Sequence, residues 1–255
     1  MLQIQPLFDE REEWDALAAR ESLRYEVLEL SVPPALDRSG LAASCHEWYR
    51  AGKRVSSLHG AFINVNPACG DTAFRALSQR RCRESCAVAV MLGAKNVVFH
   101  SSAAPYLRGA HLDAWADTCA EFYQVLARQH QLNIFIENSI DVDPQPLATL
   151  MQHAKDPHIG VCLAVGHAHY SRVPLAQWFD ALGERIGYLH LSDNHGLYDE
   201  HLPLGSGTVD WAEADALYRQ LGKDLPVTLK VGGIDGVKRS LRYLHERGLF
   251  VQSEA

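Results

Sequence analysis

Short hydrophobic runs alternate with longer stretches of mixed polarity along most of the 255-residue chain. The short runs are rich in valine, isoleucine, leucine and aromatic residues and end near turn-forming residues, a pattern that predicts buried strands. We expect eight strands, at residues 2–5, 25–30, 55–59, 96–100, 133–137, 159–163, 186–191 and 226–230.

The amphipathic stretches between these runs predict helices. Examples are residues 71–92, 112–130, 174–182 and 210–221, with Asp71 and the segment 208–210 as typical helix starts. A strand and a helix recur about every 25 to 40 residues, the length of one βα unit. Eight such units predict a (β/α)₈ barrel that forms a single domain over residues 1–255. An open, doubly wound sheet is the competing fold, but no G-x-G-x-x-G motif follows any predicted strand.

Composition narrows the class of protein. The chain is 47% hydrophobic and 22% charged, which is typical of a soluble protein with a large core. Its net charge of −7 makes nucleic acid an unexpected partner. Neither a signal peptide nor a membrane-spanning run is visible, and the six scattered cysteines indicate reduced thiols. We therefore expect a cytoplasmic protein with a small-molecule substrate, and leave a homo-oligomer open.

Chemistry-bearing side chains gather where the predicted strands end. They are His59, His100, Glu137, His167, His190, Asp199, His201 and Lys230. In an α/β barrel the carboxyl ends of the strands meet at one face, where catalysis is done. Imidazole and carboxylate groups are ligands of zinc, manganese, iron and cobalt. A single histidine at a strand end is more often a hydrogen-bonded core residue, and Asp199 with His201 could lie in a solvated loop. Together, however, the eight predict one metal-containing pocket.

Five of these segments resemble the xylose isomerase-like TIM-barrel superfamily. The motifs are LHGAFIN, NVVFHSS, NIFIENS, GVCLAVGHAH and YLHLSDNHGLYDEHLPLGSG, between residues 55 and 207. That group includes sugar and sugar-phosphate isomerases and epimerases, dehydratases and the endonuclease IV family. The resemblance implies a barrel enzyme that uses divalent metal, with one or two ions of zinc, manganese or cobalt.

The resemblance also implies roles for single residues. His59, His100 and Glu137 match one metal group of the endonuclease-like members, and His167, Asp199 and His201 match another. Between them the isomerases have a central metal held by Glu, Asp, His and Glu on strands five to eight.

This chain keeps Glu137 and His190 at the central site but has Ala164 for the aspartate and Lys230 for the last glutamate. The two departures change the charge of the central site by three units, so we expect a metal to bind poorly there. We expect the Lys230 ammonium to lie within reach of Glu137. Glu137, Lys230 and His190 are the expected catalytic residues.

Three interpretations stay open at this point. In the first, the protein is an isomerase or epimerase in which the ammonium replaces the charge of the central metal. In the second, it is an endonuclease IV-like hydrolase or phosphodiesterase in which the flanking groups each hold a metal. The third is a catalytically inactive binding protein, whether Ala164 and Lys230 are native or engineered. A Schiff-base role for Lys230 would require a depressed pKa.

Overall fold

The structure is a computed structural model that describes residues 1–5, 11–28 and 55–250. Its eight strands form a closed barrel in which each strand pairs in parallel with the next, and β1 pairs with β8. The strands are β1 (Leu2–Ile4), β2 (Arg24–Leu28), β3 (Val55–His59), β4 (Asn96–His100), β5 (Asn133–Glu137), β6 (Ile159–Ala164), β7 (Ile186–Leu191) and β8 (Val227–Leu229). The predicted (β/α)₈ barrel is therefore confirmed.

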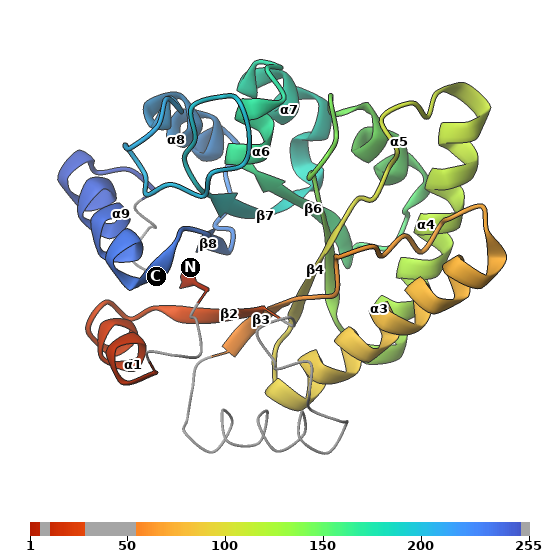
Figure 1. The fold of residues 1–255 in the computed structure, drawn as a ribbon, viewed down its shortest axis with the longest axis horizontal. Helices are drawn as coiled ribbons and strands as arrows, with labels where there is room; N and C mark the ends of the chain where they lie inside the picture. Colours follow the sequence, from red (N-terminus) through yellow and green to blue (C-terminus); the bar gives the residue numbers. More distant parts are fainter. Residues whose placement is uncertain (6–10, 29–54, 251–255) are drawn as a thin grey trace.

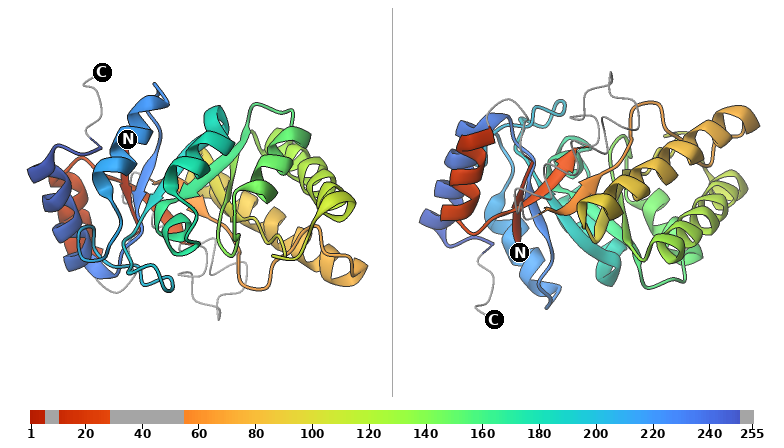
Figure 2. Two further views of the ribbon diagram at one scale, coloured as in Figure 1. Left: turned by 90° about the horizontal axis from the view of Figure 1, so that it is seen from above. Right: turned by 90° about the horizontal axis from the view of Figure 1, so that it is seen from below.

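Helices cover the outside of the barrel (Figure 1; Figure 2). Within the described residues they are α1 (Arg11–Arg20), α3 (Thr72–Leu92), α4 (Gly109–His130), α5 (Gln145–His153), α6 (Val165–Tyr170), α7 (Leu175–Leu182), α8 (Trp211–Gln220) and α9 (Gly233–Arg247), with a 3₁₀ turn, η3 (Gly183–Arg185). The four helices predicted from the pattern correspond to α3, α4, α7 and α8.

Two of these helices begin where the sequence predicts. Asp71 accepts a hydrogen bond from the backbone N–H of Phe74, and Asp210 accepts from those of Ala212 and Glu213. Each carboxylate satisfies backbone donors that the first helical turn leaves without a partner. These caps fix the points at which the chain leaves a strand-end loop and enters α3 or α8.

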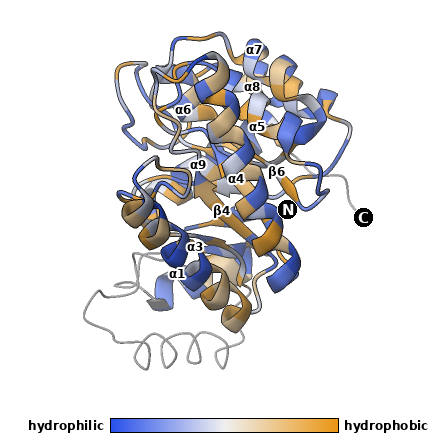
Figure 3. Ribbon diagram, turned by 90° about the vertical axis from the view of Figure 1, so that its right-hand side faces the viewer, coloured by the Kyte–Doolittle hydropathy of each residue, from blue (hydrophilic) through white to orange (hydrophobic). Residues whose placement is uncertain are grey.

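The main hydrophobic core lies between the barrel and its helices. Strands at the centre carry hydrophobic side chains, and the surrounding helices vary between hydrophobic and hydrophilic along their length (Figure 3). All six residues of β6 are buried, as expected of a strand covered on both sides.

A second, smaller cluster lies inside the barrel. Val98, Cys162 and Tyr188 pack together there, with Phe135 against them. A Cβ atom on Gly187 would come within 2.5 Å of the Phe135 ring, so this glycine gives the ring its space. Phe135 and Glu137 are two residues apart and point to the same side of β5. The aromatic layer therefore lies directly beneath the layer that contains Glu137.

Some sequence predictions differ from the structure in their boundaries. β8 ends at Leu229, so Lys230 lies just beyond the strand instead of being its last residue. Residues 29 and 30 of the predicted second strand lie outside the described residues, as does Cys45. The described cysteines form no disulfide, and among the described helices none is long and apolar enough to cross a membrane.

Candidate active site

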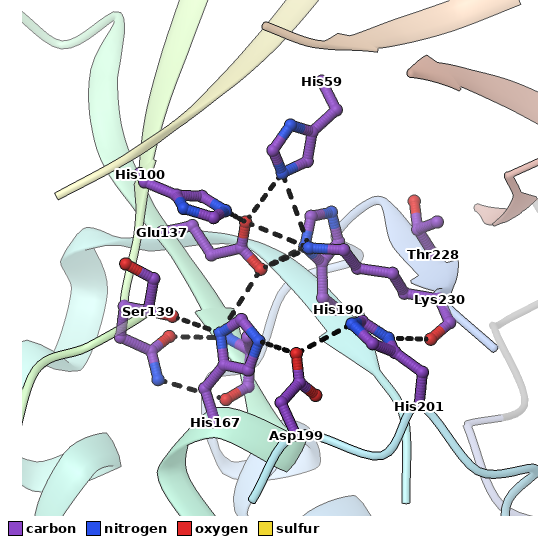
Figure 4. A network of polar contacts seen from close by, with 12 residues as sticks. His59, His100, Glu137, Ser139, His167, His190, Asp199, His201, Thr228 and Lys230 are labelled. Atoms are coloured by element: carbon purple, nitrogen blue, oxygen red, sulfur yellow. Dashed lines mark hydrogen bonds and ion pairs between the residues drawn. The ribbon is translucent and has the colours of Figure 1, made fainter. Parts of the chain in front are cut away.

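The carboxyl ends of the strands open onto a pocket of about 390 Å³. Of the eight candidate residues, six line this pocket: His59, His100, His167, Asp199, His201 and Lys230. Glu137 and His190 are fully buried and contact members of this set directly or through each other. Figure 4 shows the eight side chains converging from separate strands and loops. The volume is that of a pocket for a small molecule.

His59, His100 and Glu137 form the first group of possible metal ligands. The strand register places His100 opposite Glu137, and Val98 opposite His59. Oε2 of Glu137 lies 3.0 Å from Nε2 of His59 and 3.3 Å from Nε2 of His100. The ring nitrogens of both histidines therefore face one carboxylate oxygen.

The first group fits a divalent cation because the Nε2 atoms of both histidines point toward one carboxylate oxygen. Nε2 of His100 is buried and makes no hydrogen bond to any described residue. Nδ1 of His59 lies 3.2 Å from the carbonyl oxygen of Gly60 and can donate to it, which leaves the Nε2 lone pair toward Glu137. A metal ligand of this kind has its other ring nitrogen fixed by a carbonyl or carboxylate.

Both histidines are held neutral in the metal-free site. Burial lowers the pKa of His100 to about 4, against the opposing effect of Glu137. Burial, followed by the charge of Lys230, also lowers the pKa of His59. Neutral imidazole is the form that binds metal, so neither ring has to lose a proton near neutral pH.

His167, Asp199 and His201 form the second group, on α6 and the loop that follows β7. Nε2 of His167 lies 3.1 Å, and Nε2 of His201 2.8 Å, from Oδ2 of Asp199. Nδ1 of His167 donates to the carbonyl of Asn138, and Nδ1 of His201 donates to that of Lys230, at 2.6 and 2.7 Å. With Nδ1 so engaged, Nε2 is the nitrogen of each ring that is available to a metal beside the carboxylate.

The charge of Asp199 reflects the same arrangement. Burial alone would raise the pKa of this carboxyl group, but hydrogen bonds from His167 and His201 outweigh burial and lower its pKa. The carboxylate is therefore ionised over the working pH range and is available as a ligand. The second group fits a divalent cation on the chemistry of its three donors.

Hydrogen bonds to the carboxylate of Asp193 hold the loop between β7 and α8 in place. The carboxylate accepts hydrogen bonds from the backbone N–H groups of Gly205 and Val209 and from the Trp211 indole. A Cβ atom at Gly207 would lie 2.4 Å from the carbonyl oxygen of Asn194, so only glycine fits there. This buried carboxylate anchors the loop from which Asp199 and His201 reach the pocket.

Lys230 lies against the first group. Its Nζ is 3.1 Å from Oε1 and 3.4 Å from Oε2 of Glu137, and 3.5 Å from Nε2 of His59. Its side chain is only 12% exposed. Burial favours the neutral amine, but Glu137 and Glu26 outweigh it and raise the pKa of Lys230. The side chain is thus an ammonium, which excludes the depressed pKa that a Schiff-base nucleophile requires.

His190 and Ala164 complete the centre of the site. Nδ1 of His190 lies 2.8 Å from Oε1 of Glu137, and Nε2 lies 2.9 Å from Oε2 of Glu26. Glu137, Cys162 and His190 are also close enough to form a third group of possible ligands. Ala164 is buried at the end of β6 and brings only a methyl group, where the resemblance to the sugar isomerases implies a carboxylate.

Like Cys162 of the third group, Glu26 is a site residue that the sequence analysis did not predict. It lies in the middle of β2, between the hydrophobic residues Tyr25 and Val27, and is fully buried. Although burial works against the charge, His190 and other partners lower the pKa of Glu26 to about 2. The sequence signal for Glu26 is a carboxylate inside a hydrophobic strand, at one of the alternate positions whose side chains point into the barrel.

Comparison with known proteins agrees with the barrel fold described above. An uncharacterized protein of Methanocaldococcus jannaschii, MJ1311, is 24% identical over 201 residues, which span 74% of this chain and 68% of that protein. The TTHB071 protein of Thermus thermophilus, solved after soaking with ZnCl₂, matches with a TM-score of 0.78 and 24% identity over 96% of both chains. A D-tagatose 3-epimerase-like protein matches with a TM-score of 0.77 and 21% identity, again over 96% of both chains.

The two solved structures share the fold with this chain. The family description that matches is the xylose isomerase-like TIM barrel, over residues 6–247. That span contains both groups of possible metal ligands and every strand from β2 to β8. The chain belongs to the xylose isomerase-like TIM-barrel family.

Proposed function

We propose that this protein is a metal-dependent enzyme of the sugar isomerase or epimerase type. Its substrate is a small hydroxylated or phosphorylated molecule, bound at the carboxyl-terminal mouth of the barrel. The observation that carries the proposal is that two three-residue ligand groups and one buried ammonium border the same pocket of about 390 Å³. The epimerase-like neighbour of known structure supports the reaction type.

His59, His100 and Glu137 would hold one metal, and His167, Asp199 and His201 would hold another. Zinc, manganese or cobalt suits this mixture of imidazole and carboxylate ligands. A bound divalent ion would polarise a substrate oxygen as a Lewis acid. Nδ1 contacts with backbone carbonyls orient the rings of His59, His167 and His201 so that Nε2 would be the ligand atom.

Lys230 would act on the substrate from the place between the two groups. When a proton leaves the carbon next to a carbonyl, negative charge develops on the carbonyl oxygen. An ammonium that is already in place stabilises that charge without reorganisation. Lys230 lines the pocket and is held on Glu137, so its position is set before substrate arrives. Glu137 and His190 would keep that ammonium paired and oriented.

A second function is favoured by the complete His167–Asp199–His201 group. The other ligand group and Lys230 line the same pocket, and two metals at one pocket are typical of hydrolysis of phosphate esters. In that reaction Lys230 would bind an anionic phosphate oxygen. The two functions differ in the bond that is broken, so one assay of each kind separates them.

Proton exchange with solvent tests the isomerase or epimerase proposal most directly. We would incubate metal-loaded protein with a panel of free and phosphorylated ketoses in D₂O and follow deuterium at the carbon beside the carbonyl by NMR. Lys230→Met is the matched variant, since it keeps the length of the side chain without its charge. Metal-dependent exchange that falls at least about tenfold in this variant is expected from loss of a charge-stabilising group.

The other outcomes are equally informative. Hydrolysis of bis(p-nitrophenyl) phosphate without deuterium exchange would favour the hydrolase. Binding of a ketose without either reaction, in protein that contains metal, would identify a non-catalytic binding protein and contradict both enzymatic proposals.

A further inference from the structure

Glu26 lies beneath the pocket and contacts neither ligand group directly. Its carboxylate accepts hydrogen bonds from side chains on β7, on β8 and directly after β1, namely Tyr188, His190, Thr228 and Gln5. Such a concentration of donors holds a buried carboxylate in one orientation and offsets the cost of its burial. The position of Glu26 is therefore determined by the barrel and not by a bound ligand.

The orientation of His190 follows from that of Glu26. One ring nitrogen lies 2.9 Å from Glu26 and the other 2.8 Å from Glu137. The ring also stacks on His59, with centroids 5.9 Å apart and planes 17° from parallel. A histidine binds a metal through the lone pair of a ring nitrogen. Both nitrogens of His190 thus have carboxylate partners, whereas His59, His167 and His201 each have a backbone carbonyl at Nδ1 and a carboxylate at Nε2 only.

The two oxygens of Glu137 have different neighbours. Oε1 lies 2.8 Å from His190 and 3.1 Å from Lys230, whereas Oε2 lies 3.0 Å from His59 and 3.3 Å from His100. The carboxylate thus turns one oxygen toward His190 and Lys230 and the other toward the first ligand group. Lys230 also lies 3.4 Å from Oε2, but its closer contact and the contact of His190 are with Oε1, and these two contacts hold the direction of Oε2.

We propose that Glu26 is a positioning residue that acts through His190 on Glu137, so that Oε2 of Glu137 is presented to a metal between His59 and His100. In this arrangement His190 is not a metal ligand, and together with Lys230 it fills the central place of the site. The inference rests on the proposed metal binding at the first group. It goes further by assigning a role to Glu26 and by removing His190 from the set of ligands.

The contacts of the two buried carboxylates agree with this assignment. Glu26 and Glu137 have no exposed surface, His190 lies between them, and Lys230 contacts Glu137. The metal positions that remain are on either side of this cluster, at the first and second ligand groups.

The test is a zinc titration of the full-length protein and its Glu26→Gln variant. Glutamine keeps the shape of the side chain but not its charge, and it offers one acceptor where four donors converge. Loss of such an outer contact weakens metal binding roughly 10- to 100-fold. We expect this loss at the His59–His100–Glu137 group alone, with the His167–Asp199–His201 group unchanged as an internal control. Tyr188→Phe, which removes one donor to Glu26 but leaves His190 in place, is expected to cause a much smaller loss.

A general loss of structure would weaken both groups together, so the selective loss distinguishes a positioning role from a structural one. Equal affinity of both proteins for zinc at both groups would overturn the assignment of Glu26. Absence of zinc from the unmodified protein would overturn the proposed function as well, and is seen without any variant.

Should Glu26→Gln not fold, zinc X-ray absorption on a protein with His167→Ala, Asp199→Ala and His201→Ala tests whether His190 is a ligand. These substitutions disable the second group and leave Glu26 intact. We expect two imidazole ligands on the remaining zinc, from His59 and His100. A count of three would show that His190 binds the metal and would overturn the inference.

Discussion

Nζ of Lys230 lies 3.1 Å from Oε1 of Glu137, at the position where the resemblance to the sugar isomerases implies the last metal-binding glutamate. Glu137 is fully buried, and burial opposes its charge, but Lys230 and His190 outweigh burial and hold its pKa well below the ordinary value. The lysine therefore serves the carboxylate as a built-in counter-ion. A metal in the same place would have to displace the ammonium from its partner.

Restoring the family pattern should open a central metal position. We expect protein with Ala164→Asp and Lys230→Glu to bind one more equivalent of manganese or cobalt than the unmodified protein, as measured by titration calorimetry. The double substitution makes the centre more negative by three charges, and it adds two oxygen ligands of the kind that these metals prefer.

Lys230→Met is the matched control for that experiment. It removes the ammonium and supplies no ligand, so the stoichiometry should not rise. If the double variant and the unmodified protein bind metal with equal stoichiometry and affinity, Lys230 does not guard the centre.

The low pKa of His100 predicts a specific pH dependence of stability in metal-free protein. Its pKa is about 4 in the folded protein, below the ordinary value of 6.5. Between these values the unfolded chain binds more protons, so the free energy of unfolding falls as the pH falls from 6.5 to 4 and is unaffected by this group above 6.5. The loss is up to about 3 kcal/mol.

Chemical denaturation of the unmodified protein and of His100→Gln at several pH values measures this effect. The difference between the two unfolding free energies should change across pH 4 to 6.5, because glutamine does not titrate. A difference that stays constant over this range would show that His100 has an ordinary pKa.

Much of the site could be predicted from the sequence because strand ends can be located from it. His59, His100 and Glu137 close hydrophobic runs, and parallel strands bring their carboxyl ends together. That a carboxylate is expected at the position of Lys230 came from the resemblance to the sugar isomerases and not from the strand pattern. What a strand end does not reveal is which atoms meet, so the division of the Glu137 oxygens between two sets of partners could not be predicted.

Site residues that lie below the mouth of the barrel were harder to predict from the sequence. Glu26 and Cys162 lie inside strands, one layer deeper, where a sequence pattern predicts only packing. Their closeness to His190 depends on the register between strands, and a shift of that register occurs within both the β2–β3 and the β6–β7 pairs. His167 was expected after β6, but the pattern did not predict that it lies on the short helix α6.

The aromatic layer under the site should be sensitive to one added methyl group. Gly187→Ala would place a carbon 2.5 Å from the Phe135 ring, and overpacking of this kind costs about 1–3 kcal/mol of unfolding free energy. Gly70→Ala is the control, since no atom lies within 4 Å of the added carbon there. Urea denaturation compares the two. Equal stability of both variants would show that the interior accommodates the methyl group freely.

The two ligand groups should be separable by substitution. Asp199→Asn removes the charge to which His167 and His201 both point, so we expect the loss of one bound metal and retention of the other. Elemental analysis after gel filtration measures this. If Asp199→Asn retains two metals, or loses both, the groups do not bind independently.

Anomalous diffraction from crystals of the zinc-loaded, unmodified protein tests the proposed metal arrangement most directly. We predict two zinc peaks. One should lie among His59, His100 and Glu137, and the other among His167, Asp199 and His201, with Lys230 still on Glu137 between them. A zinc peak bonded to His190, with Lys230 displaced from Glu137, would contradict this arrangement, and so would a map with no zinc at either group.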